Sequence, residues 1–118
     1  MKNKQGFNGF DGKTLGILGG GQLGRMIGLS AARLGLKIII MDPNKNSPAF
    51  QVANEVIIAN FEDKKKLKKL ASSCDTITYE FENIPLDSLR YIAKYTKVYP
   101  GIYPLEISQD RLIEKTFL

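Results

Sequence analysis

The sequence has 118 residues and a formal net charge of +5, with 43% hydrophobic and 25% charged residues, which is ordinary for one soluble globular domain with a modest core. It contains no histidine, so Ser-His-Asp and Cys-His nucleophile systems and most zinc sites are excluded within this chain. The single cysteine, Cys74, excludes an internal disulfide and fits a reducing cytoplasm. No apolar run approaches the roughly 18 to 20 residues that a membrane-spanning helix needs.

Short β-branched runs alternate with helical patterns of about ten residues along the chain. In chain order the pattern predicts a strand at 14–18, a helix at 22–34, a strand at 37–41, a short helix at 48–53, a strand at 55–58, a helix at 62–71, a strand at 76–79, a helix at 86–95 and a strand at 97–99. This alternation is typical of an α/β fold in which a parallel sheet is flanked by crossover helices.

Helix ends are predicted from capping residues. Gly35 suits the C-terminus of the first helix, and Asn60 is the candidate N-cap of the second. Pro85 is expected just inside the start of the third.

Three segments follow from these elements: a flexible leader at 1–13, one domain at 14–103, and the start of a linker helix at 104–118. The last helical pattern reaches Leu118 without a C-cap, glycine or polar tail. We therefore expect this chain to be the N-terminal piece of a longer protein.

Five lysines lie within residues 64–69. They are either a patch for nucleic acid or phosphate, or the solvent face of a helix whose apolar side holds Phe61, Leu67, Leu70 and Ala71. The cluster is short and has no interleaved arginine or aromatic residue, which favours the solvent face.

The stretch GILGGGQLGRM, residues 16–26, leads from the first strand into the first helix. Gly19, Gly21 and Gly24 satisfy the G-x-G-x-x-G pattern, in which glycines form a tight turn and the helix N-terminus binds an anion. Asp42 ends the second strand about 20 residues later, where a dinucleotide site places its ribose-binding carboxylate. Gln22 at the helix start is polar and favours a different phosphate-bearing ligand, for which Arg25 is a candidate partner. A third alternative is that the glycines only allow close packing of strand and helix, and all three stay open on this loop alone.

A second polar stretch, TYEFENIP at 78–85, follows the fourth strand and meets the same edge of the sheet. Extended geometry sends Glu80 and Glu82 to one side, where they could accept hydrogen bonds from ribose hydroxyls, polarise an amine or act as a base. The alternative is a solvated turn in which Asn83 caps the next helix.

The third stretch, SQDRLIEK at 108–115, predicts a helix with Ser108 as N-cap. Arg111 and Lys115 are spaced i, i+4 on one face. The alternative is an ordinary amphipathic helix that packs through Leu112, Ile113 and Phe117.

Four stretches taken together, GILGGGQLGRM, MDPNKNSPAFQVAN, CDTITYEFENIP and QDRLIEKTFL, resemble the N5-carboxyaminoimidazole ribonucleotide synthetase family, the ATPase subunits of phosphoribosylaminoimidazole carboxylase within the ATP-grasp superfamily. The resemblance implies a Rossmann-like pre-ATP-grasp domain that holds 5-aminoimidazole ribonucleotide in purine biosynthesis. It implies that the substrate is bound by Gly20, Gly21, Gln22, Leu23, Gly24 and by Glu80 or Glu82, and that Arg111 and Lys115 contact ATP.

The chemistry implied by the resemblance is a carboxylation driven by ATP. Bicarbonate is phosphorylated to carboxyphosphate, and the activated carbon dioxide reaches the exocyclic amine of the ribonucleotide. The catalytic residues and the magnesium ligands belong to domains outside this chain, so the fragment is expected to be inactive alone. The family implies a cytoplasmic homodimer whose functional partner is the N5-carboxyaminoimidazole ribonucleotide mutase, with no nucleic-acid or membrane partner. The alternative function is an NAD(P)-binding Rossmann domain of an oxidoreductase.

Overall fold

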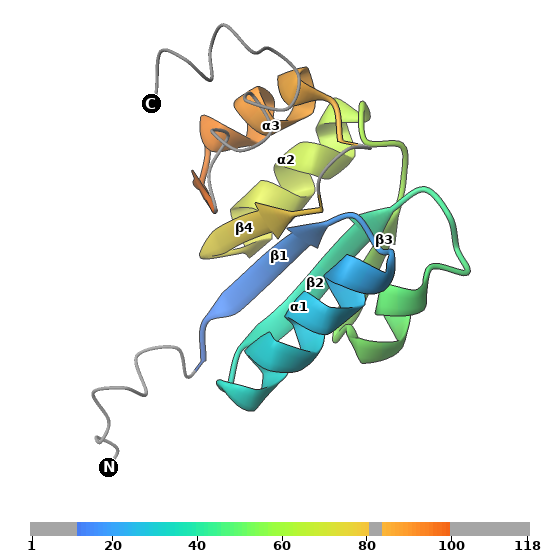
Figure 1. The fold of residues 1–118 in the computed structure, drawn as a ribbon. Coiled ribbons are helices and arrows are strands. Elements are labelled where there is room, and N and C mark those ends of the chain that lie inside the picture. The colour runs from blue at the N-terminus through green and yellow to red at the C-terminus, as the bar shows by residue number, and fades with distance from the viewer. Residues whose placement is uncertain (1–11, 81–83, 100–118) are drawn as a thin grey trace, which may run out of the picture.

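A computed structural model of the chain describes residues 12–80 and 84–99 (Figure 1). Its elements are, in chain order, β1 (Thr14–Leu18), α1 (Gln22–Arg33), β2 (Lys37–Asp42), the 3-10 helix η2 (Pro48–Val52), β3 (Glu55–Ile58), α2 (Lys64–Ser73), β4 (Thr76–Tyr79), α3 (Leu86–Ala93) and β5 (Lys97–Val98). All five predicted strands are present, and the predicted helices correspond to α1, η2, α2 and α3.

The five strands form one parallel sheet in the order β3-β2-β1-β4-β5. The central strand β1 pairs with β2 on one side, Leu18 opposite Met41, and with β4 on the other, Leu18 opposite Tyr79. The chain therefore leaves β1 toward one edge and later returns to the other side of it, which makes the carboxyl end of β1 the switch point of the sheet. The predicted α/β class with a parallel sheet is confirmed.

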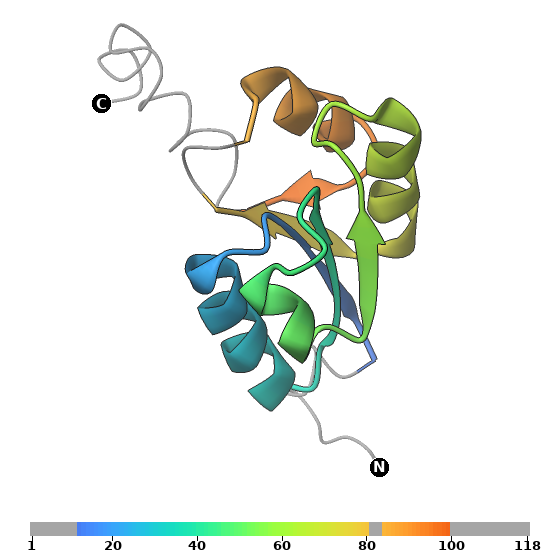
Figure 2. The same cartoon turned by 90° about the vertical axis from the view of Figure 1, so that its right-hand side faces the viewer.

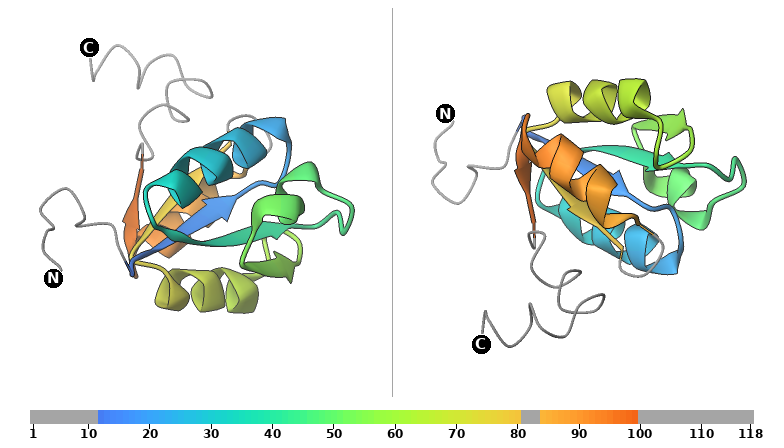
Figure 3. Two further views of the ribbon diagram at one scale, coloured as in Figure 1. Left: turned by 90° about the horizontal axis from the view of Figure 1, so that it is seen from below. Right: turned by 90° about the horizontal axis from the view of Figure 1, so that it is seen from above.

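Alternating side chains of the strands supply two separate cores, one on each face of the sheet. On one face, α1 and η2 pack over Leu15, Ile17, Ile38 and Ile40. On the other face, α2 and α3 pack over side chains of opposite parity, which are Leu18, Ile39, Met41, Ile77 and Tyr79. Figure 2 shows α1 beside η2, with α2 and α3 grouped apart from them, and Figure 3 shows α1 and α2 on opposite faces. Both faces of the central strands are covered, as their continuous apolar sequences require.

The N-terminal caps of two helices differ from the predictions, and α2 and α3 end at Ser73 and Ala93 instead of at residues 71 and 95. The N-cap of α2 is Asp63, whose carboxylate accepts the Lys66 N–H at 3.2 Å, so the predicted cap Asn60 and the predicted start at residue 62 are wrong. Asn60 instead accepts the Glu62 N–H within the preceding turn, which is the competing local bond that Asn favours. Pro85 occupies the N-cap position of α3, one residue before the helix rather than inside it.

The C-terminus of α1 follows the prediction at Gly35. Its φ of 85° lies in the left-handed region, which suits glycine. The Gly35 N–H donates to Ala32 and the Leu36 N–H donates to Ala31, the pair of bonds that defines a Schellman motif.

The lysine-rich helix α2 buries Leu67, Leu70 and Ala71 and exposes all five of its lysines. Lys64 and Lys68 lie over the rings of Tyr91 and Tyr95 on α3, at 5.6 and 5.3 Å from the ring centroids. The prediction that the lysines form the solvent face of a helix is confirmed. Tyr91 and Tyr95, which are distant in the sequence, lie next to this face. None of the helices in the described part of the chain has the length and apolarity to span a bilayer.

Cys74 is buried at the end of α2, and its sulfur lies where a Cβ on Gly16 would come within 2.7 Å. Burial, reinforced by Asp75 and Glu55, raises the pKa of the thiol to about 12. Only the thiolate reacts readily with disulfide reagents, so we expect Cys74 to resist labelling at pH 8 until the chain unfolds. Labelling followed against urea should track the loss of helical circular dichroism; rapid labelling of the folded chain would contradict this.

Candidate functional site

The glycine loop follows β1 at the switch point of the sheet and is tied to both neighbouring strands. The Gly19 N–H donates to the Met41 carbonyl of β2 at 2.8 Å. The Glu80 N–H, just beyond β4, donates to the Leu18 carbonyl of β1 at 3.0 Å. The carboxyl ends of β1, β2 and β4 therefore meet at this loop, which is where open α/β sheets bind ligands.

Glu80 faces the loop. Its Oε2 accepts the Gly21 N–H at 2.8 Å. A Cβ on Gly19 would lie 2.6 Å from the Glu80 Cγ, and one on Gly21 would lie 2.7 Å from its Oε1. Glycine at 19 and 21 is thus needed for the half-buried carboxylate to approach the loop, and the φ of 111° at Gly19 adds a backbone reason there.

Asp42 holds the same loop from the other side. Its Oδ2 accepts the Gly20 N–H at 2.7 Å, and its Oδ1 accepts the Asn44 N–H at 2.9 Å. The Gly20 carbonyl in turn accepts the Ala49 N–H at 2.8 Å, so both backbone polar groups of this buried glycine have partners. Both Asp42 oxygens hold backbone amides, which differs from the ribose-binding role that a dinucleotide site would require.

The start of α1 presents the features of an anion site. Gly21 is the N-cap and supplies no side-chain hydrogen bond, and no acidic residue lies in the first turn. The first amides of a helix have no intrahelical acceptor and carry the positive end of its dipole. Gln22 and Leu23 are exposed, whereas Gly24 is buried where a Cβ would collide with the Gly19 carbonyl oxygen.

The structure thus brings together part of the predicted site. The loop residues Gly20, Gly21, Gln22, Leu23 and Gly24 and the carboxylate of Glu80 share one end of the sheet. The remaining predicted residues, Glu82, Arg111 and Lys115, lie outside the described residues.

Two contributors to the site were not predicted from the sequence. Asp42 was considered only as a ribose acceptor, yet it positions the loop. Ser47 is buried 2.7 Å from the place of a Gly20 Cβ, and its hydroxyl donates to the Asn44 carbonyl. The signal was present in the DPNKNS stretch at 42–47, since closely spaced Asp, Asn and Ser form tight side-chain-to-backbone turns.

Comparison with known proteins identifies the family of the domain. The model of the ribonucleotide synthetase preATP-grasp domain matches residues 12–109. The chain belongs to this preATP-grasp domain family.

Individual proteins that are similar to this chain are N5-carboxyaminoimidazole ribonucleotide synthases. The chain is 51% identical over 107 residues to the N5-carboxyaminoimidazole ribonucleotide synthase of Brucella melitensis, covering 91% of this chain and 30% of that protein. It is similar to the crystal structure of N5-carboxyaminoimidazole synthetase from Staphylococcus aureus complexed with ADP, with a TM-score of 0.81, 42% identity and coverage of 91% and 29%. It is also similar to the synthase from Aspergillus clavatus in complex with ADP and 5-aminoimidazole ribonucleotide, with a TM-score of 0.74, 31% identity and coverage of 91% and 29%. The chain spans about 30% of the length of the relatives it matches.

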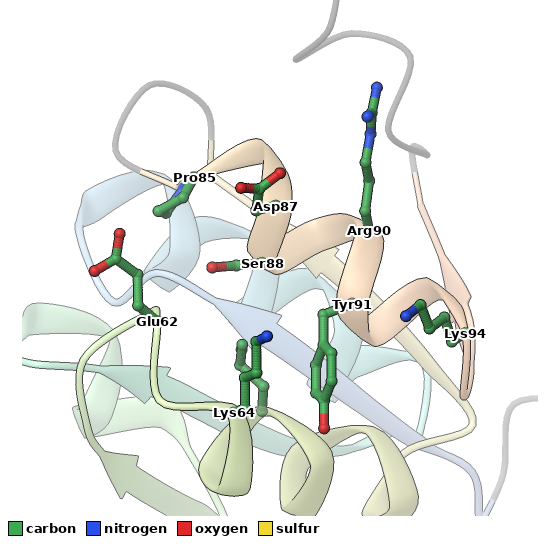
Figure 4. A pocket seen from close by; sticks show the side chains of 9 residues that line it. Glu62, Lys64, Pro85, Asp87, Ser88, Arg90, Tyr91 and Lys94 are labelled. Carbon is green, nitrogen blue, oxygen red and sulfur yellow. The ribbon is translucent and has the colours of Figure 1, made fainter.

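A hollow of about 420 Å³ in this preATP-grasp domain lies between α2 and α3 (Figure 4). Its nine lining residues include cations and carboxylates and none of the predicted site residues. Ser88 on its floor already donates to the Phe61 carbonyl at 2.6 Å, and Lys64 lies over the ring of Tyr91. Polar and cation–π contacts thus already occupy several of the polar side chains of this hollow. The hollow is separate from the glycine loop.

Replacing Asp42 with alanine should loosen the glycine loop. The buried Gly20 N–H and the Asn44 N–H would lose their acceptors, which we expect to lower the free energy of unfolding by about 1–3 kcal/mol. Urea unfolding of the chain measures this. The matched control is Asn46→Ala in the same turn, whose exposed side chain should matter little; equal losses from both would show that Asp42 has no special part in holding the loop.

Proposed function

We propose that this chain is the substrate-binding N-terminal domain of an ATP-dependent ligase that converts 5-aminoimidazole ribonucleotide and bicarbonate to N5-carboxyaminoimidazole ribonucleotide. The observation that carries the proposal is the joint placement of a glycine loop, an uncapped helix N-terminus and Glu80 at one end of a preATP-grasp sheet. It is supported by the Aspergillus clavatus relative, whose structure contains that ribonucleotide.

Each part of the site has a task under this proposal. The substrate phosphate is anionic, and the first amides of α1, at Gln22, Leu23 and Gly24, suit it. The ribose hydroxyls are donors, and Glu80 is a carboxylate acceptor whose Oε1 receives no hydrogen bond from the residues that the structure describes. Glu82, two residues further on, is proposed as a second acceptor. Together they would hold the aminoimidazole ring in a fixed position for carboxylation.

ATP, Mg²⁺ and bicarbonate are proposed to bind mainly in the rest of the protein. The described residues contain no group of three or more Cys, Asp or Glu side chains that could hold a metal ion, and they offer no general base beyond carboxylates and lysines. Arg111 and Lys115 are proposed as the contribution of this chain to the ATP site. Alone, the chain is proposed to be inactive.

The assembly and location are proposed by family likeness. The full-length protein would be a cytoplasmic homodimer. Within this chain, the proposed segments are a leader at 1–13, the substrate-binding domain at 14–103 and the start of a linker helix at 104–118. Its product would pass to the N5-carboxyaminoimidazole ribonucleotide mutase.

The test measures ADP release from ATP and bicarbonate by the full-length protein, with and without 5-aminoimidazole ribonucleotide. We expect release that depends on the ribonucleotide and falls when Glu80 and Glu82 are both changed to Gln. Release that ignores the ribonucleotide would overturn the substrate assignment. Saturable NAD binding that disappears with Asp42→Ala would instead restore the dinucleotide alternative.

A further inference from the structure

Positive charge is concentrated on one side of the fold. Residues 62–73 and 86–97, which include α2 and α3, contain eight lysine or arginine residues and three acidic residues. The other described residues contain five basic and four acidic residues. Nearly all of the net positive charge of the described residues therefore belongs to the part of the chain that covers one face of the sheet.

The lysines of α2 are placed against the usual preferences of a helix. Lys64, Lys65 and Lys66 form its first turn, beside the positive end of the helix dipole, and the N-cap carboxylate is a single negative charge against these three. Lys68 and Lys69 each follow another lysine at i, i+4, where like charges repel. Both features lower the stability of the helix, and both costs fall when an anionic group binds beside it.

Two tyrosines of α3 and the turn after it hold three of the lysines in place. Nζ of Lys64 and Nζ of Lys94 lie 5.6 and 5.9 Å from the ring centroid of Tyr91. Nζ of Lys68 lies 5.3 Å from the ring centroid of Tyr95, and the two rings are in edge contact with centroids 5.4 Å apart. Within the described residues, these three ammonium groups form no ion pair with a carboxylate. They are thus positioned in advance and keep hydrogen-bond donors for an anionic partner.

The hollow between α2 and α3 has an acidic end and a basic end. Figure 4 shows Glu62 and Asp87 toward one side of the hollow and Tyr91 and Lys94 toward the other. Lys68 continues the basic end along α2. A negatively charged partner is therefore repelled at one end and attracted at the other, which gives its binding a direction.

The α2–α3 face is formed by the side chains of Lys64, Lys68, Tyr91, Lys94 and Tyr95. We propose that this face binds an acidic segment of a partner protein, with the carboxylates of the segment on the three lysines. Lys64 and Lys68 are ~6 Å apart along the helix axis, and alternate side chains of an extended strand repeat at ~6.6 Å. An extended segment with acidic residues at alternate positions can therefore meet both lysines. The face contains none of the proposed substrate-site residues, so this inference does not depend on the proposed function.

An acidic protein segment fits the α2–α3 face better than a single-stranded nucleic acid does. Nucleic-acid sites of this kind combine basic residues with open aromatic faces on which bases stack. Here the rings of Tyr91 and Tyr95 are engaged with ammonium groups and with each other. Carboxylates need only the ammonium groups, which the face presents.

The experiment titrates the 118-residue chain into a fluorescently labelled decaglutamate peptide and follows anisotropy at physiological ionic strength. We expect the double variant Lys64→Gln with Lys68→Gln to raise the Kd at least about fivefold, because two charge pairs are lost. The matched control is Lys37→Gln with Lys45→Gln, which removes the same charge from exposed lysines outside the face. Circular dichroism checks that each variant is folded.

Three outcomes of this titration overturn the proposal. The first is no binding of the peptide by the unchanged chain. The second is an equal loss of affinity in both double variants, which would indicate attraction to the net charge alone. The third is tighter binding of an oligothymidylate of the same length through the same two lysines, which would indicate a nucleic-acid site.

A pair of tyrosine variants tests the α2–α3 face without changing its charge. Tyr95 and Tyr99 are 48% and 52% exposed, and each has one lysine over its ring, at 5.3 and 5.4 Å. Only Tyr95 belongs to the face, so we expect Tyr95→Leu to raise the Kd for decaglutamate about two- to fivefold by releasing Lys68. Tyr99→Leu is the matched control and should leave the Kd unchanged. An unchanged Kd in Tyr95→Leu, or an equal rise in both variants, overturns the proposal.

Discussion

Gly24→Ala should destabilise the domain by about 3 kcal/mol, at the upper end of what overpacking costs. A Cβ at this position would collide with the Gly19 carbonyl oxygen, which belongs to the backbone and is held in place by the bond from the Gly19 N–H to Met41. The start of α1 would have to move away from β1. Urea unfolding of the 118-residue chain, followed by circular dichroism, measures the loss.

Gly28→Ala is the matched control for this prediction, because Gly28 is also buried on α1. The neighbour of its added Cβ would be the Val52 Cγ2 at 2.8 Å, the end of a side chain that can shift. Alanine also favours the helix by about 0.8–1 kcal/mol over glycine. We expect a net change below about 1 kcal/mol, and equal losses at positions 24 and 28 would show that the backbone contact at Gly19 is not the cause.

Glu80→Gln should reduce the ribonucleotide-dependent ADP release of the full-length protein by about 10- to 100-fold in kcat/KM. Hydrogen bonds to a charged group contribute about 1.5–3 kcal/mol, and glutamine has one acceptor oxygen where the carboxylate has two. That oxygen can still accept the Gly21 N–H, so the loop should keep its conformation while the acceptor offered to ribose is lost.

The control is Glu62→Gln, which removes an exposed carboxylate away from the loop. Its kcat/KM should match that of the unchanged protein. The thermal midpoint of Glu80→Gln should also stay within a few degrees. Full activity in Glu80→Gln, or an equal fall in both variants, would remove Glu80 from the substrate site.

Much of the fold could be predicted because hydrophobic periodicity follows directly from burial. The strands at Thr14–Leu18, Glu55–Ile58 and Thr76–Tyr79 begin and end where the pattern predicts. The start of α2 could not be decided this way. Asn60 and Asp63 are both good capping residues, and only the path of the chain after β3 determines which one begins the helix.

The site was predicted less completely, because its key bonds join residues far apart in the sequence. The distance of Asp42 from the glycines matched a ribose-binding acid, but its bond to Gly20 depends on how the two loops approach each other. Likewise, alternation along the chain after β4 indicated that Glu80 and Glu82 share a side, and the contact with Gly21 shows that Glu80 faces the loop.

The two carboxylates on consecutive amides have an electrostatic consequence. Gly20 and Gly21 each donate to an acidic side chain, so two formal negative charges lie beside a helix N-terminus worth roughly half a positive charge. A phosphate drawn to that helix also meets repulsion from Asp42 and Glu80, despite the net charge of +5 on the whole chain. Under the proposed function, we therefore expect this end of the sheet to favour ligands that carry hydrogen-bond donors as well as a phosphate. A bare inorganic anion lacks the hydroxyls that could donate to the two carboxylates.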